Sequence, residues 1–269
     1  MNFNSDARER QPGAPAAVGS MRAETEVRKG ASPNQRPVID RLRVAEVYAS
    51  RQGEGRWTGA PSVFLRTSGC NLRCWFCDTP FASWHPEGDS LTVEEVLART
   101  LAFSESDVVV TGGEPLLFPS IGEVCRRLRA AGRRVTIETA GTIDQAVECD
   151  LLSVSPKLSS SAPDAVAHPS WHTTHHARRQ QINLVRRWTQ QFDYQLKFVV
   201  SDLGDAAEVL DYLEQLGSAD PDRVWMMPEG TSMEVLESRA AWLVPWCLQH
   251  GFHYCPRSHI AWYGNRRGT

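Results

Sequence analysis

Short apolar runs rich in β-branched residues alternate with longer helical patterns from Leu42 onward. The strand-like runs, each followed by a turn that contains Gly, Pro or Ser, are VAEVYA, PSVFLRTS, DVVVTGG, RRVTIETAG, DLLSVSPK, YQLKFVVS and RVWMMPEG. Strands that alternate with helices favour parallel pairing with right-handed crossovers. The pattern therefore predicts an α/β domain built on an open sheet or on a full or partial barrel.

The helical segments between these runs have recognisable ends. Thr92 and Glu95 form a capping box at the start of TVEEVLARTLAF, and PSIGEVCRRLRAAG begins with a proline and ends at a glycine. We also predict helices over 204–217 and 232–251, the second with a kink at Pro245.

Polar and glycine-rich motifs follow the strand-like runs at the point where each run ends. These motifs are TSGCNLRC, TGGEP, ETAGT, SPK and MPEG. The carboxyl ends of parallel strands meet at one edge of a sheet or barrel, which is where such folds place their active sites. We therefore expect the chemistry of this protein at that edge.

Composition narrows the class of function. The length of 269 residues allows one large core or two small ones, and the formal net charge of -3 provides no basic field for wrapping nucleic acid. A small-molecule substrate is the better expectation. No run of about eighteen apolar residues is present, so the sequence predicts no membrane span.

The seven cysteines are odd in number, and three of them are crowded together, which is unlike the even framework of a secreted disulfide protein. We therefore expect a reduced, cytoplasmic protein. Residues 1–38 are rich in Pro, Gly, Ala and charge and contain no apolar signal-peptide core. They predict a disordered N-terminal extension ahead of a folded domain over 39–269.

The stretch CNLRCWFCDTP places Cys70, Cys74 and Cys77 within eight residues. A closed zinc site needs four ligands and a redox pair needs two, so three thiols leave one coordination position open. An iron–sulfur cube held by three thiolates keeps one iron free for a small chelating molecule, such as the amino and carboxylate groups of S-adenosylmethionine. Trp75 and Phe76 would shield such a cluster.

A zinc-stabilised binding module is the alternative, with His85 as the fourth ligand of the same three cysteines. Zinc motifs usually come as separated pairs, which disfavours this interpretation. The next motif, TGGEPLL, contains two glycines whose backbone N–H groups we expect to receive a carboxylate or an amino-acid moiety.

Together these motifs resemble the radical S-adenosylmethionine superfamily, whose hallmarks are CxxxCxxC with an aromatic residue before the last cysteine and a GGEP turn after the next strand. The segment ASRQGEGRWTGAPSVFLRTSGCNLRCWFCDT is similar to the 7-carboxy-7-deazaguanine synthases. The likeness continues through TGGEPLL, ETAGT, SVSPKLS, QLKFVV, MPEG and WYGNRRGT, and covers roughly residues 42–269.

The resemblance implies a partial parallel (β/α)6 TIM-like barrel for a radical S-adenosylmethionine catalytic domain over 39–269. It implies a lyase that converts 6-carboxy-5,6,7,8-tetrahydropterin to 7-carboxy-7-deazaguanine with loss of ammonia, in queuosine or other 7-deazapurine biosynthesis. The implied cofactors are a 4Fe-4S cluster, S-adenosylmethionine and Mg2+. The implied partners are an electron donor such as flavodoxin or ferredoxin and a second copy of the chain in a homodimer, without nucleic acid or membrane.

The resemblance also assigns residues. The cluster ligands are Cys70, Cys74 and Cys77, and the magnesium ligand is Thr79. The residues expected to bind S-adenosylmethionine are Phe76, Cys77, Asp78, Gly113, Ser155, Pro156 and Lys157. The residues expected to bind substrate are Gln52, Gly53, Glu54, Arg66, Thr111, His259 and Thr269.

Residue chemistry suits several of these roles. Gln52, the Gly53 backbone and Glu54 can supply the paired donors and acceptors that a guanine-like pterin edge needs. Arg66 can bind the substrate carboxylate through two hydrogen bonds, although an ordinary surface ion pair is the alternative. The free carboxylate of Thr269 could accept substrate N–H bonds if the last residue folds into the site.

An alternative radical enzyme would activate a glycyl-radical protein, which needs a wide open groove in place of a small polar pocket. Two segments depart from the family pattern. CPRSHIAWYG replaces a more usual serine-proline-arginine-leucine-histidine sequence, and the long irregular insertion 158–180 contains His168, His172, His175 and His176. This insertion suggests a second metal, but we expect a solvated, partly helical loop, because histidines in irregular surface segments usually bind nothing.

Overall fold

The computed structural model describes residues 41–269, so the extension predicted over 1–38 lies outside the described part. The described residues form one nine-stranded sheet in the order β3-β1-β2-β4-β5-β6-β7-β8-β9. The strands are β1 (Arg41–Arg51), β2 (Pro61–Thr67), β3 (Asp89–Thr92), β4 (Asp107–Gly112), β5 (Arg134–Thr139), β6 (Leu151–Val154), β7 (Tyr194–Val200), β8 (Val224–Pro228) and β9 (His253–Tyr254).

The sheet is parallel from β2 through β9, and β3 and β9 are its two edges. It therefore forms the incomplete parallel barrel that the sequence predicted, with β2, β4, β5, β6, β7 and β8 as its main parallel strands. Only β1 runs antiparallel, to both β2 and β3. The connection 52–60 between β1 and β2 is too short to contain the crossover helix that parallel pairing requires.

The helices are α1 (Val93–Leu101), α2 (Ile121–Ala130), α3 (Pro169–Arg178), α4 (Ile182–Gln191), α5 (Leu203–Leu216), α6 (Met233–His250) and α7 (Ser258–Tyr263). The capping box at Thr92 and Glu95 is present, and α2, α5 and α6 confirm the predicted helices. No helix within 41–269 is both long and apolar enough to cross a membrane.

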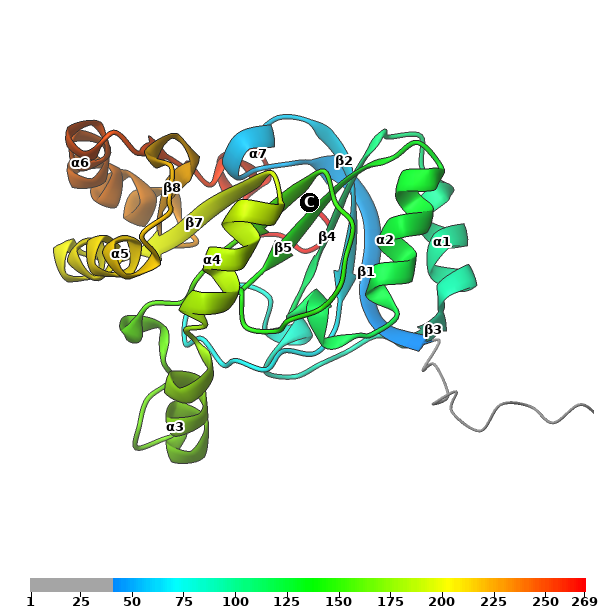
Figure 1. Cartoon of the computed structure of the whole chain (residues 1–269), viewed down its shortest axis with the longest axis horizontal. Helices are drawn as coiled ribbons and strands as arrows, with labels where there is room; N and C mark the ends of the chain where they lie inside the picture. Colours follow the sequence, from blue (N-terminus) through cyan, green and yellow to red (C-terminus); the bar gives the residue numbers. More distant parts are fainter. Residues whose placement is uncertain (1–40) are drawn as a thin grey trace, which may run out of the picture. The chain divides into compact units, whose positions relative to one another are not determined.

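Four of the strands and α-helices were missed: β3, β9, α4 and α7. The apolar residues Ile182, Val185 and Trp188 recur every three positions in α4, which was a usable helix signal. The insertion 158–180 contains a short 3-10 turn, Ser159–Ser161, and α3, which lies apart from the helices that cover the sheet (Figure 1).

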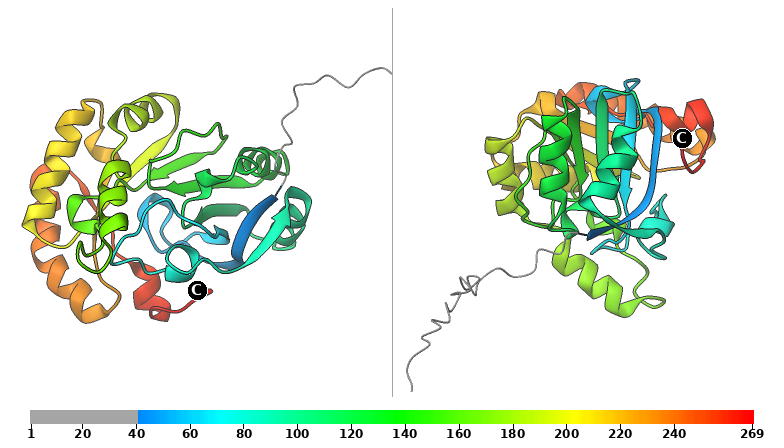
Figure 2. Two further views of the ribbon diagram at one scale, coloured as in Figure 1. Left: turned by 90° about the horizontal axis from the view of Figure 1, so that it is seen from below. Right: turned by 90° about the vertical axis from the view of Figure 1, so that its right-hand side faces the viewer.

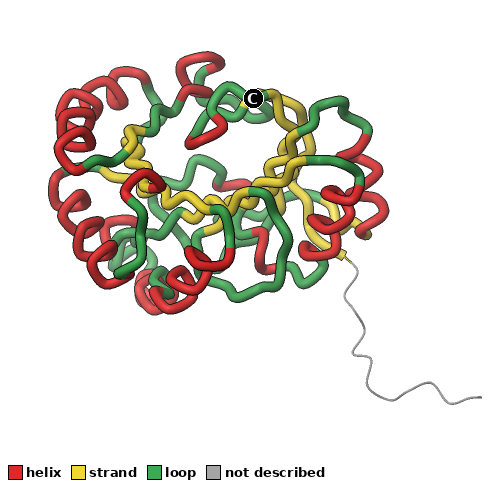
Figure 3. The backbone as a smooth tube through the Cα atoms, turned by 45° about the horizontal axis from the view of Figure 1, so that its top comes forward, coloured by secondary structure: helices red, strands yellow, loops and turns green. Residues whose placement is uncertain are grey.

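Helices α1, α2, α4, α5 and α6 lie on the outer side of the curved sheet, and the C-terminal segment, which contains α7, lies on its inner side (Figures 2 and 3). Successive side chains of each parallel strand point alternately to these two sides of the sheet. In β7, Leu196 and Phe198 belong to the apolar core, whereas Lys197 lines a cavity on the inner side. The core is thus on the helix-covered face, and the inner face is free to carry polar groups.

We predict that Ile137→Ala, in the central strand β5, lowers the free energy of unfolding by about 2–5 kcal/mol, because Ile137 is fully buried and the cavity it leaves cannot collapse completely. Leu248→Ala is the matched control, because Leu248 in α6 is 78% exposed. Anaerobic urea titration should show a change within about 0.5 kcal/mol for the control. Equal losses in both variants would contradict this description of the core.

Candidate active site

A cavity of about 490 Å³ lies at the carboxyl ends of the parallel strands, within the size range of small-molecule sites. Its wall contains all of the predicted cluster, magnesium, cofactor and substrate residues except Pro156. Seven of these are the predicted substrate residues: Gln52, Gly53, Glu54, Arg66, Thr111, His259 and Thr269. The fold therefore brings segments from both ends of the described chain to one place, as the motif positions predicted.

The three crowded cysteines all line this cavity as free thiols. Burial raises the pKa of Cys70 and of Cys74 to about 12, so binding a metal there must displace thiol protons. His85, the fourth ligand of the zinc alternative, is exposed and does not line the cavity. Within 41–269, no three His, Cys, Asp or Glu side chains are grouped closely enough to hold a single metal ion. A donor set of three thiols on one loop fits a cluster with one free corner.

The aromatic residues of this loop do not both shield the cavity. Phe76 lines it, but Trp75 is 55% exposed and lies outside. The Trp75 indole Nε1 instead donates to the Ser160 carbonyl at 2.8 Å. The prediction that Trp75 shields a cluster was therefore wrong, because its indole hydrogen bond holds the ring against the insertion.

The GGEP turn packs against the cysteine loop. Gly113 N donates to the Thr67 carbonyl at 3.2 Å, and Glu114 N donates to the Gly69 carbonyl at 2.8 Å. A Cβ at Gly113 would collide with the carbonyls of Gly69 and Ala82. The prediction that the Gly113 N–H receives a ligand was wrong, because this N–H already donates to the Thr67 carbonyl. The close approach that glycine permits here is to the protein backbone.

Glu114, in the same turn, is fully buried and has a structural role. Its carboxylate accepts from Leu116 N at 3.1 Å, from Thr139 Oγ1 at 2.8 Å and from Ala140 N at 2.8 Å. Glu114 therefore joins the loops that follow β4 and β5, both of which border the cavity.

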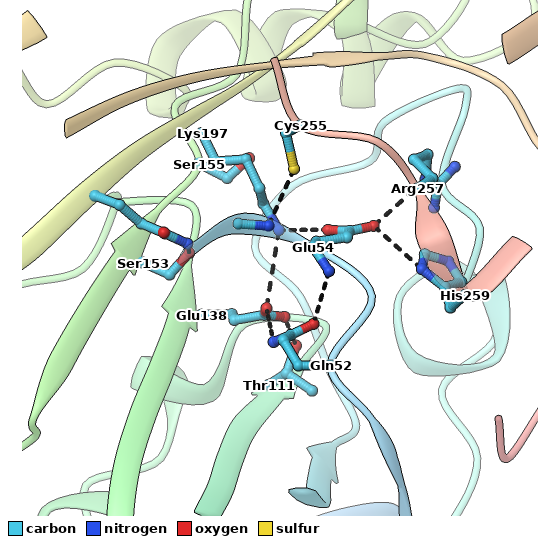
Figure 4. A network of polar contacts seen from close by, with 12 residues as sticks. Gln52, Glu54, Thr111, Glu138, Ser153, Ser155, Lys197, Cys255, Arg257 and His259 are labelled. Carbon is cyan, nitrogen blue, oxygen red and sulfur yellow. Dashed lines mark hydrogen bonds and ion pairs between the residues drawn. The ribbon is translucent and has the colours of Figure 1, made fainter. Parts of the chain in front are cut away.

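An ionic network centres on Glu54, whose side chain is 14% exposed and whose cationic partners Lys197 and Arg257 are buried (Figure 4). Its carboxylate accepts from Lys197 Nζ and, at 3.3 Å, from Arg257 Nε. Burial alone would raise the pKa of Glu54, but Lys197 and Arg257 outweigh it and hold that pKa below its usual range. Burial would likewise lower the pKa of Lys197, but Glu54 and Glu138 raise it. Glu54 and Lys197 are therefore both charged at neutral pH.

Glu138 connects this network to the predicted substrate residues. Its Oε1 accepts from Gln52 Nε2 at 3.2 Å, and its Oε2 accepts from Thr111 Oγ1 at 2.9 Å. Lys197 Nζ lies 3.8 Å from Glu138 Oε1. Sequence reasoning missed Glu138 and Lys197, although Glu138 belongs to the ETAGT motif and Lys197 is a single charge within an apolar strand run.

Arg257 was also missed, and it ties three loops together. Its Nη1 donates to the Gly230 carbonyl at 2.6 Å, its Nη2 pairs with Asp78 and its Nε reaches Glu54. It lies in CPRSHIAWYG, the segment that departs from the family pattern. In this segment His259 packs against Gly53 so closely that a Cβ on Gly53 would overlap the imidazole ring.

Arg66 combines the two alternatives considered for it. Its side chain is 15% exposed, and its Nε pairs with Glu46 at 2.8 Å while its Nη2 donates to the Tyr48 hydroxyl at 2.9 Å. Its Nη1 makes no hydrogen bond with residues 41–269, and Arg66 lines the cavity. Glu46 also accepts from Arg267 Nε at 3.0 Å, which positions the segment ending at Thr269 beside the cavity.

Lys157 and Ser155, predicted to bind the cofactor, both line the cavity. Lys157 Nζ donates to the carbonyl and to the hydroxyl of Ser155, both at 2.8 Å. The ammonium group is therefore held at the end of β6, on the same side of the cavity as Ser155.

The sequence predicted that the histidine-rich insertion is a solvated loop, but one of its histidines is not exposed to solvent. His168 and His176 are exposed, but His175 is fully buried. The prediction was wrong for His175, because the helical spacing of α3 turns this one ring inward, where both of its nitrogens find partners.

Comparison with known proteins identifies the family. A sequence model of the radical SAM superfamily matches residues 64–193. The 7-carboxy-7-deazaguanine synthase of Rhodopirellula baltica is 49% identical over 229 residues, which cover 85% of this chain and 89% of that protein. The chain belongs to the 7-carboxy-7-deazaguanine synthase family.

A second 7-carboxy-7-deazaguanine synthase, from Halobacterium salinarum, is 39% identical and covers 92% of this chain and 99% of its own length. The crystal structure of QueE from Escherichia coli superposes with a TM-score of 0.62 at 21% identity, over 81% of this chain and 95% of that one. The structural match shows the shared open α/β fold, and the sequence matches show the 7-carboxy-7-deazaguanine synthase family.

We predict that Glu54→Gln and Lys197→Met each lower the free energy of unfolding by about 3–5 kcal/mol, because each removes the nearest partner of a charged side chain that is at most 14% exposed. The double variant should lose about 1–3 kcal/mol less than the sum of the single variants. Urea denaturation of the four proteins measures this coupling. The exposed pair Glu123 and Arg126 is the control and should show no measurable coupling. Additive losses at Glu54 and Lys197 would show that the buried pair is not coupled.

Proposed function

We propose that this protein converts 6-carboxy-5,6,7,8-tetrahydropterin to 7-carboxy-7-deazaguanine with loss of ammonia, as a carbon–nitrogen lyase of queuosine or other 7-deazapurine biosynthesis. One observation carries the proposal: the three free thiols and the polar groups of Gln52 and Glu138 open into the same small cavity. A cofactor bound at the thiols would therefore lie next to a substrate bound at the polar groups. The family membership supports this assignment.

Cys70, Cys74 and Cys77 would hold the 4Fe-4S cluster. Phe76, Cys77, Asp78, Gly113, Ser155, Pro156 and Lys157 would surround S-adenosylmethionine. When bound, the cluster and S-adenosylmethionine supply a reductive cleavage of the sulfonium and hence a carbon radical able to abstract hydrogen. The chain's own part is to fix the cofactor and the substrate in contact and to keep water out of the cavity.

The substrate side of the cavity offers the groups that a carboxylated pterin needs. The amide of Gln52 and the carboxylate of Glu138, already joined at 3.2 Å, present donors and acceptors to a guanine-like edge. Arg66 Nη1 would bind the substrate carboxylate, while Glu46 and Tyr48 hold the rest of the guanidinium in place. Gly53, Glu54, Thr111, His259 and Thr269 would complete the substrate site.

Thr79 lies on the wall of the same cavity, with its Oγ1 3.7 Å from Cys77 Sγ, and this hydroxyl would be a ligand of Mg2+. A hydroxyl oxygen suits this hard cation, which keeps several water ligands and commonly takes further oxygens from the substrate. The ion would thereby orient the substrate carboxylate relative to the cluster side of the site.

Activation of a glycyl-radical protein is not favoured. That reaction needs a groove that admits a polypeptide segment, whereas here Arg267 and Thr269 contribute to the cavity wall. We further propose that residues 39–269 form the catalytic domain. The enzyme would act in the cytoplasm as a homodimer, with electrons from a flavodoxin or ferredoxin.

The expected result of an anaerobic assay with reconstituted protein, reductant, S-adenosylmethionine, Mg2+ and the carboxytetrahydropterin is a product lighter by one ammonia, detected by mass spectrometry. Cys74→Ala should abolish product formation, because it removes one of three cluster ligands. Cys149→Ala is the matched control. Cys149 is a free thiol that does not line the cavity, so this substitution should leave activity unchanged. Cleavage of S-adenosylmethionine without the lighter product would rule out the pterin as substrate.

A further inference from the structure

His175 is fully buried in α3, outside the catalytic cavity. Its Nε2 lies 2.8 Å from Ser161 Oγ, and its Nδ1 accepts from Arg73 N at 3.3 Å. Arg73 belongs to the cysteine loop and directly precedes Cys74. An imidazole ring from the insertion therefore contacts the backbone between two proposed cluster ligands.

The hydrogen bonds around this ring fix its tautomer. Ser161 Oγ donates its single proton to the Leu158 carbonyl at 2.6 Å, so it must accept from His175 Nε2–H. This leaves the Nδ1 lone pair for Arg73 N–H. Burial lowers the pKa of His175 to about 4, so the ring is neutral and able to accept at Nδ1. A continuous chain of hydrogen bonds thus runs from Leu158, just after the SPK motif, to the cysteine loop.

Other contacts from the insertion hold the same part of the loop. Trp75 N donates to the Ser161 carbonyl at 3.2 Å, and the Trp75 indole donates to the Ser160 carbonyl. The guanidinium of Arg73 lies 4.0 Å from the centre of the Trp171 ring of α3. The insertion therefore contacts the residues on both sides of Cys74, and His175 makes a hydrogen bond from a fully buried side chain to the backbone N–H of the residue that precedes this cysteine.

We propose that His175 is a positioning residue for the cluster: by accepting from Arg73 N–H it fixes the Leu72–Arg73 peptide, directly before Cys74, against α3, and so sets the place of the Cys74 sulfur. Groups that orient metal ligands typically change metal affinity by about 10–100-fold when they are removed. This inference rests on the proposed function only in that the cysteine loop holds a cluster.

Three substitutions separate the two nitrogens of the ring. In His175→Asn, the side-chain oxygen takes the place of Nδ1 and can still accept from Arg73 N. In His175→Gln, the longer amide reaches the place of Nε2 and can contact Ser161, but it offers no acceptor at the position of Nδ1. His175→Leu removes both contacts. His172→Asn is the matched control on α3, since His172 contacts the Pro163 carbonyl and not the cysteine loop.

The experiment measures iron and sulfide per chain, the rate of cluster loss to a chelator, and the electron paramagnetic resonance signal of the reduced cluster with and without S-adenosylmethionine. His175→Gln and His175→Leu should lose the cluster at least about tenfold faster and alter the signal. His175→Asn and His172→Asn should match the wild type. Urea denaturation measures the folding stability of each variant. Any difference in stability between the Asn and Gln variants can then be separated from their difference in cluster loss.

Equal cluster retention in His175→Asn and His175→Gln, whether both keep or both lose the cluster, would overturn the proposal. Amide hydrogen exchange of the wild-type holoenzyme tests it without any variant: Arg73 N–H should be strongly protected, and rapid exchange would contradict the contact with His175. These readouts need no pterin, so a failure of pterin conversion bears on the proposed function alone.

Discussion

The ion pairs of the Glu54 carboxylate are the interaction on which the arrangement of the site depends. It binds two cations, Lys197 from β7 and Arg257 from the segment before α7. Removing it would take away the nearest anionic partner of Lys197, which would then have only Glu138 at 3.8 Å, and would leave Arg257 paired with Asp78 alone. Arg257 also pairs with Asp78, which follows the last of the three crowded cysteines. These ion pairs therefore link the cysteine loop to the Glu54 and Lys197 side of the cavity, and separating them would cost free energy.

The open sheet makes this network possible. Its helix-covered face supplies the core, so the inner face need not be apolar, and strand residues such as Glu138 and Lys197 can carry charge there. The loops at the carboxyl ends then close the cavity, together with the segment that Arg267 anchors to Glu46 and Glu87. A partial barrel gains a small enclosed site in this way without further strands.

The sequence predicted the parallel α/β fold and the gathering of motifs at one edge, because strand periodicity is local and parallel strands end together. It could not predict the pairings inside the site, since they join distant positions. Gln52 and Glu138 are 86 residues apart, and Glu54 and Arg257 are 203 residues apart. No periodic pattern marks such partners.

The corrections at Gly113 and His175 have one physical reason. The sequence shows that a glycine allows close approach and that a histidine lies in an irregular polar segment, but it does not show which groups of the protein each of them contacts. Gly113 N–H is used by Thr67, and the two nitrogens of His175 are used by Ser161 and Arg73. Only the packed structure distinguishes a free donor from one that holds the fold together.

A crystal structure of the anaerobically reconstituted protein with S-adenosylmethionine and the carboxytetrahydropterin tests the central claim most directly, that one cavity places cofactor and substrate in contact. We expect a cluster on Cys70, Cys74 and Cys77, the pterin edge against Gln52 and Glu138, and its carboxylate at Arg66. A pterin bound outside this cavity, or a metal centre that takes a fourth protein ligand, would contradict the account.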